Sequence, residues 1–595
     1  MVTDLDTVLQ KIVGFGKYQI LSLLLLSLTG FGVAFHNLIH VFTGNLPPYL
    51  CSDFIHLQLN SSRPASQIFY ESDDGVLHTF SINVYDRSET EMIFVNTSDR
   101  KTLLRNISVS NVNCAGSFKL IGAVDTNEST NGQYSKCSSW AFDRCIYEST
   151  VGTEWSLVCE KTWLLPLMQS LHMIGALIGA LLGGIAADRF GRRPTLLVAV
   201  VMELTSGIAT AFAPNLAVYG LLRLVAGIAV STLYNAVLIT AVEIVTPRWR
   251  LFVGTSLLYV NALGIMLLAL LAYLIRSWRT LQLVASSLLM VHLLYFWAIP
   301  ESPRWLLLKG RHFAATAHLR RMCQINGRSW PEEVELSRPI STQHKSSITD
   351  LIKSPKLRWR TIKISVIWLG LCIAYYGLSL YTSELDGDDF VNFLISGIVE
   401  VPALTFAILA DRKFGRRTLL AVPLACAGIT LLVVAPIPDS MAWMRVTLAM
   451  TGKLGLSAAY TTIYSFTVEL FPTCLRSNGL GVSSVSAKIG GLVAPFISLL
   501  SVHGRMIPLL LCGALAFFSC GLVLLLPETS HLPLTETVAE AERSSVSETL
   551  FSQLCFRATG ESAEVKKQSS QRQEEVLVGA MPNTKLLDTP EQQEA

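Results

Sequence analysis

ADRFGRR at residues 187–193 and ADRKFGRR at residues 410–417 are two similar charged stretches, one in each half of this chain. The aspartates that they share, at 188 and 411, are 223 positions apart. Two further pairs of landmarks repeat at nearly the same offset. Glutamates at 243 and 469 are 226 positions apart, and Pro-Glu dipeptides at 300 and 527 are 227 positions apart. Three landmarks at nearly one offset indicate a duplicated unit, so we expect two similar halves.

The composition predicts that both halves lie in a membrane. Of 595 residues, 51% are hydrophobic and only 15% are charged, whereas about 25% charged residues is usual in soluble domains. Apolar runs of about 20 residues can cross a bilayer, and they must then be helical because lipid offers the backbone no partner. We predict twelve such spans, six in each half, at 18–43, 163–187, 194–214, 217–245, 251–275, 280–299, 361–382, 390–410, 418–437, 441–468, 479–502 and 506–526.

The segment between the first two spans, residues 45–160, is polar. Its four N-glycosylation sequons and five cysteines form a combination typical of an oxidising, extracellular loop. Because five is an odd number, one thiol is either free or paired elsewhere. The sequons are at Asn60, Asn96, Asn106 and Asn127, and the candidate disulfide cysteines are Cys51, Cys114, Cys137, Cys145 and Cys159.

Basic residues indicate the orientation independently. The short loops after spans 2, 4, 8 and 10 hold ten Lys and Arg residues, and the short loops on the other side hold three. We therefore predict that the first set of loops and both termini are cytoplasmic. The predicted division is an N-terminus at 1–17, a six-helix bundle at 18–300, a connector at 301–360, a second bundle at 361–527 and a largely disordered tail at 528–595.

The charged loops are candidates for a conformational latch. Gly191 permits a tight turn after span 2, from which Arg192 or Arg193 can reach a glutamate or a helix C-terminus. Such clusters can hold two helices together and break when the halves rock. The alternative is plain positive charge on the cytoplasmic side. The candidate latch residues are Asp188, Arg189, Gly191, Arg192, Arg193, Glu243, Glu301, Asp411, Arg412, Gly415, Arg416, Arg417, Glu469, Arg476 and Glu528.

With these motifs, the chain resembles a known group. The two charged loops, P-E-S-P-R-W at 300–305 and the large first loop look like the organic ion transporters of the major facilitator superfamily, solute carrier family 22. G-F-G-K-Y-Q at 14–19, E-W-S-L-V-C at 154–159 and E-L-F-P-T at 469–473 support the resemblance. It implies the twelve-helix, all-α fold of that superfamily and alternating access without ATP hydrolysis.

Lys488 is the most informative polar residue within a span. It lies roughly 15 Å from the inner start of span 11, near the middle of a core about 30 Å thick. A midplane ammonium needs a counter-anion, from the protein or from a substrate. In the family that this chain resembles, the anion branch usually carries Arg here and the cation branch Asp, so Lys488 favours anions. A structural pair with Glu400, at a matching depth of about 16 Å, is the alternative.

Further polar and aromatic residues within the spans are predicted to surround Lys488. Tyr375 and Tyr376 resemble the family's Tyr-Tyr-Gly-Leu motif, and aromatic rings beside a cation can hold the apolar body of an acid. Helix packing is the alternative for these residues. Arg223 is expected to extend toward the outer headgroups. The remaining candidates are His36, Asn37, Asn261, Trp368, Tyr460, Tyr464, Ser484 and, in the outer half of span 10, Lys453.

The sequence favours a plasma-membrane carrier of small amphipathic organic anions, working as a uniporter or by exchange for a counter-anion. Leu404 stands where well-known anion members carry Lys, which favours a monoanion. An organic cation or zwitterion carrier, favoured by Glu400, and a non-transporting receptor are the alternatives. The chain contains no Walker loop, metal-spaced His/Cys cluster or nucleophile elbow, so we expect no enzymatic activity, ATP, cofactor or metal. The net charge of +3 gives no reason to expect nucleic acid.

Overall fold

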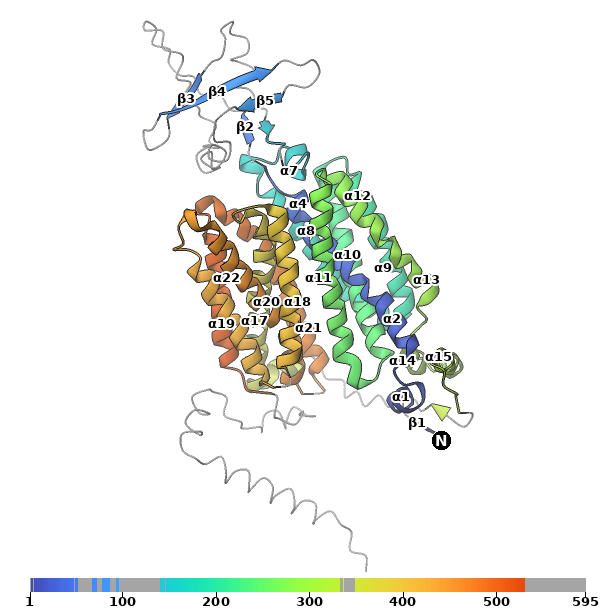
Figure 1. Cartoon of the computed structure of the whole chain (residues 1–595). Helices are drawn as coiled ribbons and strands as arrows, with labels where there is room; N and C mark the ends of the chain where they lie inside the picture. The colour runs from blue at the N-terminus through green and yellow to red at the C-terminus, as the bar shows by residue number, and fades with distance from the viewer. Residues whose placement is uncertain are drawn as a thin grey trace, which may run out of the picture.

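The computed structural model describes residues 2–3, 5–47, 49–51, 67–71, 77–85, 92–95, 140–144, 146–331, 335–336, 348–411, 413–472 and 474–529. Two helical bundles stand side by side, one from each half of the chain (Figure 1). The predicted all-α membrane fold is confirmed. Below, the outer end of the bundles is the end from which residues 45–160 emerge, and the inner end is the one with the charged loops.

The first bundle has two interrupted spans. Its first span consists of three consecutive short helices, and its sixth contains a 3-10 segment between two α-helices. The spans are, in order, α2 to α4 (Lys17–Ser27, Thr29–Leu38 and His40–Thr43), α8 (Leu164–Phe190), α9 (Arg192–Ala211), α10 (Leu216–Glu243), α11 (Arg250–Leu274), and α12, η5 and α13 (Trp278–Leu288, Leu289–Leu294 and Tyr295–Ala298).

The second bundle has long helices, two of which end in a 3-10 turn at the outer side. Its spans are α17 (Pro355–Leu380) with η6 (Tyr381–Glu384), α18 (Asp389–Ala410), α19 (Arg416–Val433), α20 (Ala442–Leu470), α21 (Arg476–Ile497) with η8 (Ser498–His503), and α22 (Ile507–Leu524).

Eleven of these described spans are apolar and long enough to cross a membrane by composition alone, and α20 is the exception. It has 29 residues and is long enough, but Arg445, Lys453 and many Thr and Ser residues lower its hydropathy. Because α20 packs against α17, α18 and α19, much of its surface faces protein rather than lipid. Polar groups are tolerated in a span that faces protein.

Glycines allow α8 and α10 to approach closely. A Cβ atom on Gly175 of α8 would lie 2.0 Å from the carbonyl oxygen of Leu224, and one on Gly179 would lie 2.3 Å from that of Ile228. In the other direction, a Cβ atom on Gly227 of α10 would lie 2.1 Å from the carbonyl oxygen of His172. This backbone contact places His172 beside α10.

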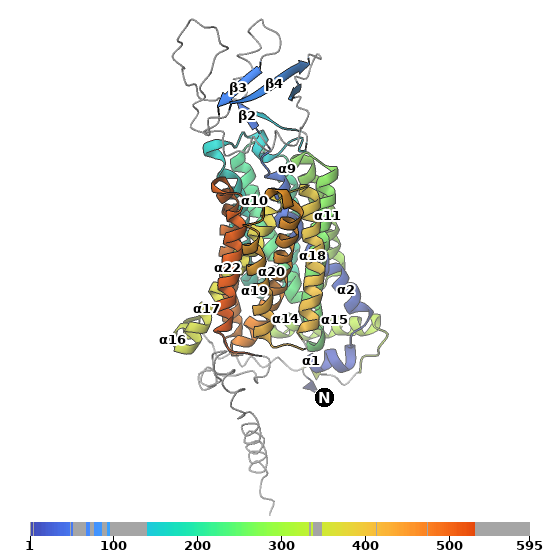
Figure 2. The same cartoon turned by 60° about the vertical axis from the view of Figure 1, so that its left-hand side comes forward.

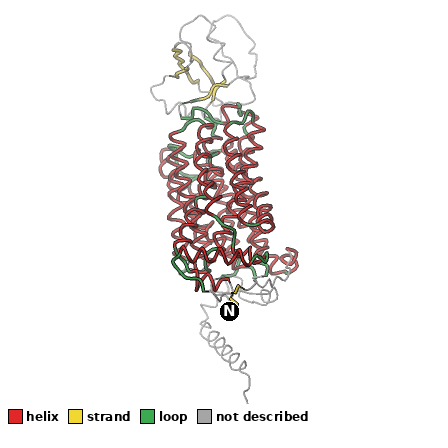
Figure 3. Tube along the Cα trace, turned by 90° about the vertical axis from the view of Figure 1, so that its right-hand side faces the viewer, coloured by secondary structure: helices red, strands yellow, loops and turns green. Residues whose placement is uncertain are grey.

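Small β-structures stand beyond the outer end of the bundles, as Figures 2 and 3 show. β2 (Tyr49–Cys51) pairs antiparallel with β6 (Trp140–Phe142), and β3 (Gln67–Glu71), β4 (Leu77–Tyr85) and β5 (Met92–Val95) form a three-stranded antiparallel sheet. Of the predicted disulfide and glycosylation residues, Cys51 ends β2 and Cys159 begins η3 (Cys159–Lys161). The sequons at Asn60, Asn96, Asn106 and Asn127, and Cys114, Cys137 and Cys145, lie outside the described residues, as does the predicted tail after residue 529.

Short elements from the N-terminus and the connector pack together at the inner end of the first bundle. The side chain of Asn326 joins them, accepting from the backbone N–H of Tyr18 at 2.9 Å and donating to Gln19 at 2.9 Å. These elements are β1 (Val2–Thr3), α1 (Leu5–Val8), η1 (Leu9–Val13), α14 (Pro303–Leu308), α15 (His312–Ile325) and β7 (Glu335–Leu336). Two further short elements lie at the inner ends, η4 (Pro247–Trp249) before α11 and α16 (Ile348–Lys353) before α17, and two lie at the outer ends, α7 (Val151–Glu154) before α8 and η7 (Asp439–Met441) before α20.

Candidate functional site

An aromatic cluster lies between α17 and α20 in the middle of the second bundle. The rings of Tyr375 and Tyr460 are stacked with their centroids 5.0 Å apart, and Tyr376 meets Tyr375 edge to face at 5.2 Å. Tyr464 extends the cluster, with its ring 5.9 Å from that of Tyr460. The structure thus brings together the four tyrosines that the sequence singled out.

Trp368 belongs to the same cluster but is turned into the bundle. Its ring lies 4.6 Å from that of Tyr464, it is fully buried, and its indole N–H donates to the Thr467 hydroxyl at 3.0 Å. This arrangement supports helix packing for Trp368. On the other side, Tyr234 of α10 lies within electrostatic range of Tyr376 and Tyr464. The sequence analysis missed Tyr234, because an isolated tyrosine in an apolar helix gives no signal.

Lys453 and Glu400 form a buried ion pair. The Lys453 ammonium lies 3.3 Å from the Glu400 carboxylate and 3.6 Å from the centroid of the Tyr375 ring. It also donates to the Ser379 hydroxyl, and the Tyr375 hydroxyl donates to Glu400. The two charges meet because each lies eleven residues from the outer start of its helix, 400 − 389 in α18 and 453 − 442 in α20. The alternative pairing of Glu400 with Lys488 is therefore wrong.

Lys488 lies in α21, twelve residues after its first residue (488 − 476), and is half-buried. Among the described residues it has no ion-pair or hydrogen-bond partner. It lies within electrostatic range of Cys372 in α17 and of His172 in α8. Ser484 is one turn away on the same helix and is also half-buried. Lys488 is thus a midplane cation at the interface of the two bundles.

A hydrogen-bonded network in the first bundle leads toward Lys488. His172 lies 2.9 Å from the Asn37 side-chain oxygen, and Gln169 donates to the Asn37 carbonyl at 2.8 Å. Arg223 donates to the His36 carbonyl at 3.0 Å and to the Gln169 side chain. Arg223 is 1% exposed, so the expectation that it extends to the outer headgroups is wrong. Carbonyl and amide oxygens inside the bundle satisfy the guanidinium instead.

A second buried acid–base pair lies deeper in the first bundle. Glu203 of α9 and His292 of η5 are both fully buried, with 2.8 Å between Oε2 and Nδ1. The ring of His36 lies close to Glu203, with its Nε2 atom buried and without a partner among the described residues. The sequence analysis singled out His36 but missed Glu203 and His292. A glutamate inside a predicted span was the signal that could have found the pair.

Aromatic and charged residues join the two bundles at their outer ends. Phe390 of α18 packs against Phe42 of α4 at 5.4 Å and Tyr147 at 5.7 Å, with the Arg276 guanidinium 4.4 Å from its ring centroid. The Tyr147 hydroxyl donates to Asp389 at 2.9 Å. Burial and the neighbouring Asp389 carboxylate raise the pKa of the Tyr147 phenol, so it remains a donor. These contacts join the two bundles at their outer ends.

At the inner end of the first bundle, Arg192 connects α8, α9 and α10. It lies 2.9 Å from Asp188 and 3.3 Å from Glu243. Glu301 accepts from the backbone N–H groups of Arg192 at 2.9 Å and Arg193 at 3.3 Å, so it caps the N-terminus of α9. Gly191 has φ +114°, and a Cβ atom there would lie 2.3 Å from Glu301.

The second bundle repeats this arrangement. Arg416 pairs with Asp411 and lies 3.0 Å from Glu469. Glu528 accepts from the backbone N–H of Arg417 at 3.2 Å, at the start of α19. The two clusters match residue for residue, and each of these bonds lies within one bundle.

Four candidate residues lie apart from these clusters. The Arg193 side chain donates to the carbonyl of Phe296, near the end of α13, at 2.8 Å, and Arg189 is exposed beside Phe190. Arg476 has two buried nitrogens without a partner among the described residues, and Asn261 contacts α3 through its backbone next to Gly30.

The last predicted residue of the charged loops, Arg412, lies outside the described residues. A Cβ atom on Gly415 would lie 2.3 Å from Glu528, as one on Gly191 would from Glu301.

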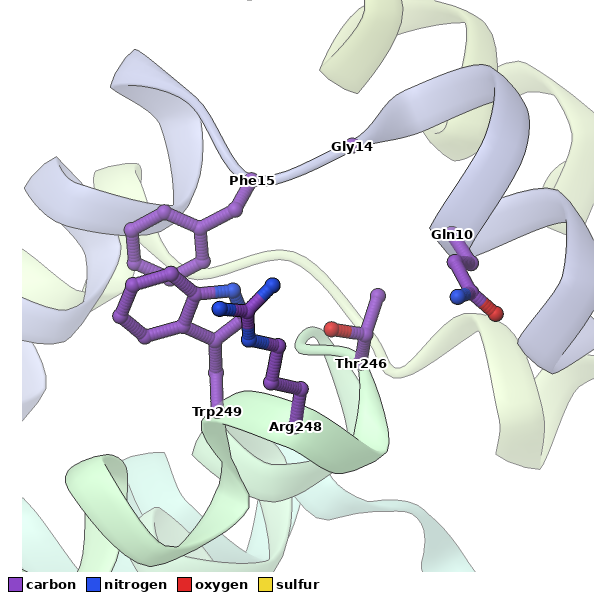
Figure 4. Close-up of a pocket in the computed structure, with 6 residues that line it drawn as sticks. All are labelled: Gln10, Gly14, Phe15, Thr246, Arg248 and Trp249. Carbon is purple, nitrogen blue, oxygen red and sulfur yellow. The ribbon is translucent and has the colours of Figure 1, made fainter.

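A cavity of about 230 Å³ lies at the inner end of the first bundle, away from Lys488 (Figure 4). The rings of Phe15 and Trp249 stack on each other at one side of it, with their centroids 4.3 Å apart. The cavity is lined by Gln10, Gly14, Phe15, Thr246, Arg248 and Trp249.

Together, these features define a class of protein. Two repeated six-helix bundles meet at a polar and aromatic interface near the midplane, with matched charge clusters at the inner ends. This is the architecture of a secondary transporter, in which the substrate binds between the two halves.

Comparisons with known proteins identify the family. The profile of the sugar (and other) transporter family matches residues 110–541. An organic cation transporter protein of Drosophila melanogaster is 34% identical over 549 residues, covering 90% of this chain and 94% of the relative. Solute carrier family 22 member 6-B of Xenopus laevis is 32% identical, covering 90% and 94%. Human organic cation/carnitine transporter 2 is 35% identical, covering 69% and 75%.

The chain belongs to the sugar (and other) transporter family and, within it, to solute carrier family 22. It is a multi-pass membrane transporter and not an enzyme. Among solved structures, the partially occluded, inward open xylose transporter XylE from E. coli is 18% identical, with a TM-score of 0.48, covering 62% of this chain and 89% of that one.

Proposed function

We propose that this transporter carries small amphipathic organic monoanions across the plasma membrane by alternating access, with both termini in the cytoplasm. One observation carries the choice of an anion. Of the charged groups at the midplane of the second bundle, Lys488 has no partner among the described residues, whereas Glu400 is bound by Lys453 and Tyr375. The group left for a substrate is therefore positive.

The surroundings of Lys488 suit an anion with an aromatic or aliphatic body. The tyrosine cluster of α17 and α20 offers ring faces and edges for apolar contact, and the hydroxyl of Ser484 is one turn from Lys488. A carboxylate or sulfate at Lys488 forms a charge-assisted hydrogen bond, which is stronger than a neutral one. Glu400 can bind a cationic substrate, as the competing function requires, only if the Lys453 ammonium moves away from the Glu400 carboxylate.

The experiment compares uptake of two aromatic solutes of similar size and opposite charge by cells that express the protein. Phenyl sulfate is the anion and benzyltrimethylammonium is the cation. The proposal predicts saturable uptake of phenyl sulfate that well exceeds uptake of benzyltrimethylammonium. Uptake of the cation alone would assign the protein to the cation branch. If the protein reaches the cell surface but takes up neither solute, the receptor alternative is favoured.

The exchange of one anion for another is tested in the same cells. Preloading with unlabelled phenyl sulfate should speed the entry of labelled phenyl sulfate if the loaded carrier reorients faster than the empty one. A dicarboxylate should be a poorer counter-anion, because the structure offers Lys488 as a single ammonium without the bidentate geometry of Arg.

A further inference from the structure

The Glu203–His292 pair in the first bundle is a buried acid–base couple outside the substrate site. Both side chains are 0% exposed, and they share one hydrogen bond of 2.8 Å between Oε2 and Nδ1. Glu203 Oε1 is buried without a partner among the described residues. An ionised carboxylate is costly in such a place unless a nearby group or a proton balances its charge.

The helices around the Glu203–His292 pair leave room for both side chains. Gly32 of α3 leaves room for Glu203, because a Cβ atom there would lie 2.3 Å from Oε1. His292 lies in η5, a 3-10 segment that interrupts the sixth span between α12 and α13. A 3-10 stretch within a helix often marks a hinge. The pair therefore joins α9, a continuous helix, to the interrupted sixth span.

In the described part of the chain, the other titratable groups around the pair and its neighbour His36 come from three helices. His36 of α3 lies between Glu203 and the substrate interface, and its ring centroid is 6.5 Å from that of His172. Tyr295 of α13 faces Glu203 and is held by a hydrogen bond of 2.9 Å with Thr29. Arg223 of α10 is bound to the His36 carbonyl at 3.0 Å.

A polar route thus connects the pair with Lys488. From Glu203 it passes to His36, then along the backbone to Asn37, and across the 2.9 Å contact to His172, which lies within electrostatic range of Lys488. With one shared proton the pair is neutral overall, and without it the pair carries one negative charge. A negative charge on this route opposes an anion at Lys488, so proton and anion binding favour each other.

We propose that the Glu203–His292 pair carries a proton that moves together with the substrate anion, which makes this transporter a proton–anion symporter. The proposal rests on the proposed anion function. A proton from water on the outer side binds the pair, and it leaves to water on the inner side when the anion is released. One proton with one monoanion makes the cycle electroneutral, so an inside-negative membrane potential does not oppose entry.

The test uses the full chain reconstituted in liposomes, with phenyl sulfate as the probe and the membrane potential clamped. Phenyl sulfate stays ionised, so it does not carry a proton through the lipid by itself. With an acidic outer solution, the wild-type protein should accumulate it roughly tenfold per pH unit of gradient. A pH dye in the lumen should report acidification when phenyl sulfate is added outside.

Glu203→Gln keeps the size of the side chain and an oxygen for His292, but it removes the titratable group. It should lose gradient-driven accumulation and lumen acidification while it still exchanges internal for external phenyl sulfate at equal pH. His292→Gln should behave in the same way, which guards against a folding defect peculiar to one variant. Ser206→Ala is the matched control, because within the described part of the chain this buried hydroxyl of α9 donates only to carbonyls of its own helix, at 2.6 Å and 3.3 Å.

Accumulation and acidification that persist in both Glu203→Gln and His292→Gln would overturn the proposal, as would their absence in the wild-type protein. Failure of the anion function looks different. In that case wild-type liposomes take up benzyltrimethylammonium and not phenyl sulfate. If the lumen pH then changes during cation uptake, and this change is lost in Glu203→Gln, the proton site stands although the anion assignment fails.

Discussion

The two bundles are alike at their inner ends and unlike in their interiors. Arg192 and Arg416 make equivalent ion pairs with an aspartate and a glutamate, and Glu301 and Glu528 cap equivalent helices. In the interiors, by contrast, the first bundle holds Glu203 with His292, and the second holds Lys453 with Glu400 and an unpaired Lys488 among the described residues.

This difference separates two tasks. The conformational cycle moves two similar bodies, so it can use a device that both halves inherited from one ancestral unit. Substrate recognition needs a charge of one sign at one place, which a symmetric interior would not provide. Changes at the inner ends should therefore affect the rate of the cycle, and changes in the interiors should affect what is carried.

The largest expected effect follows from Lys488→Ala. At an effective dielectric near 20, unit charges 4 Å apart attract by about 4 kcal/mol, and desolvation reduces the net gain to about 1–3 kcal/mol. Affinity for phenyl sulfate should fall roughly 5- to 150-fold, with the surface level unchanged in a biotinylation assay. Lys488→Arg, which keeps the charge, is the matched control and should retain uptake. Normal uptake by Lys488→Ala would remove the main reason for the anion assignment.

Lys453→Met should have the next largest effect, because it leaves Glu400 buried without its cation. Breaking a buried ion pair in this way costs about 3–5 kcal/mol, so the surface level should drop and phenyl sulfate uptake should fall about tenfold per protein molecule. Adding Glu400→Gln should restore both, since the amide oxygen still accepts from Tyr375. A double variant as impaired as Lys453→Met would contradict the role of the pair in shielding Glu400.

The inner clusters should respond equally in the two halves. Arg192→Ala and Arg416→Ala each remove two ion pairs at a bundle end, far from Lys488. Each should lower the maximal rate of phenyl sulfate uptake several-fold, on the order of 1 kcal/mol, with little change in the half-saturating concentration. Initial rates over a range of concentrations separate the two parameters. A change in half-saturation at constant maximal rate would show that the clusters act on binding.

The smallest effect is expected for Trp368→Phe. The change removes the hydrogen bond to Thr467 and keeps most of the ring packing, so the protein should lose about 1 kcal/mol of stability. Phenyl sulfate uptake per surface molecule should stay within about twofold of wild type, because Trp368 faces the interior of its bundle. Thermal unfolding of the purified protein measures the first quantity. A large loss of affinity would place Trp368 in the substrate site.

The sequence predicted the helices and the inner clusters well, because both depend on local patterns. Apolar runs set the span lengths, and the tight turn at Gly191 brings Arg192, at the start of α9, back toward Asp188 near the end of α8. The duplication then allowed the second cluster to be predicted from the first. The capping of α9 by Glu301 could not be predicted, since it depends on how α14 packs beneath the bundle.

The partners of the midplane charges were harder to predict. Depth along a helix gave Glu400 and Lys488 matching positions, but rotation of each helix about its axis decides which side chains meet. α18 and α20 turn Glu400 toward Lys453. Arg223 shows the same problem, because its position near a helix end suggested the lipid surface while its rotation places it against α3 and α8.

The most direct test of the claim that the unpaired charge at the midplane selects the substrate is uptake by Lys488→Asp. Phenyl sulfate and benzyltrimethylammonium are measured in parallel in cells with equal surface levels of wild type and variant. The account predicts that the ratio of anion to cation uptake, well above one in the wild type, falls below one in Lys488→Asp. An unchanged preference for phenyl sulfate would contradict it.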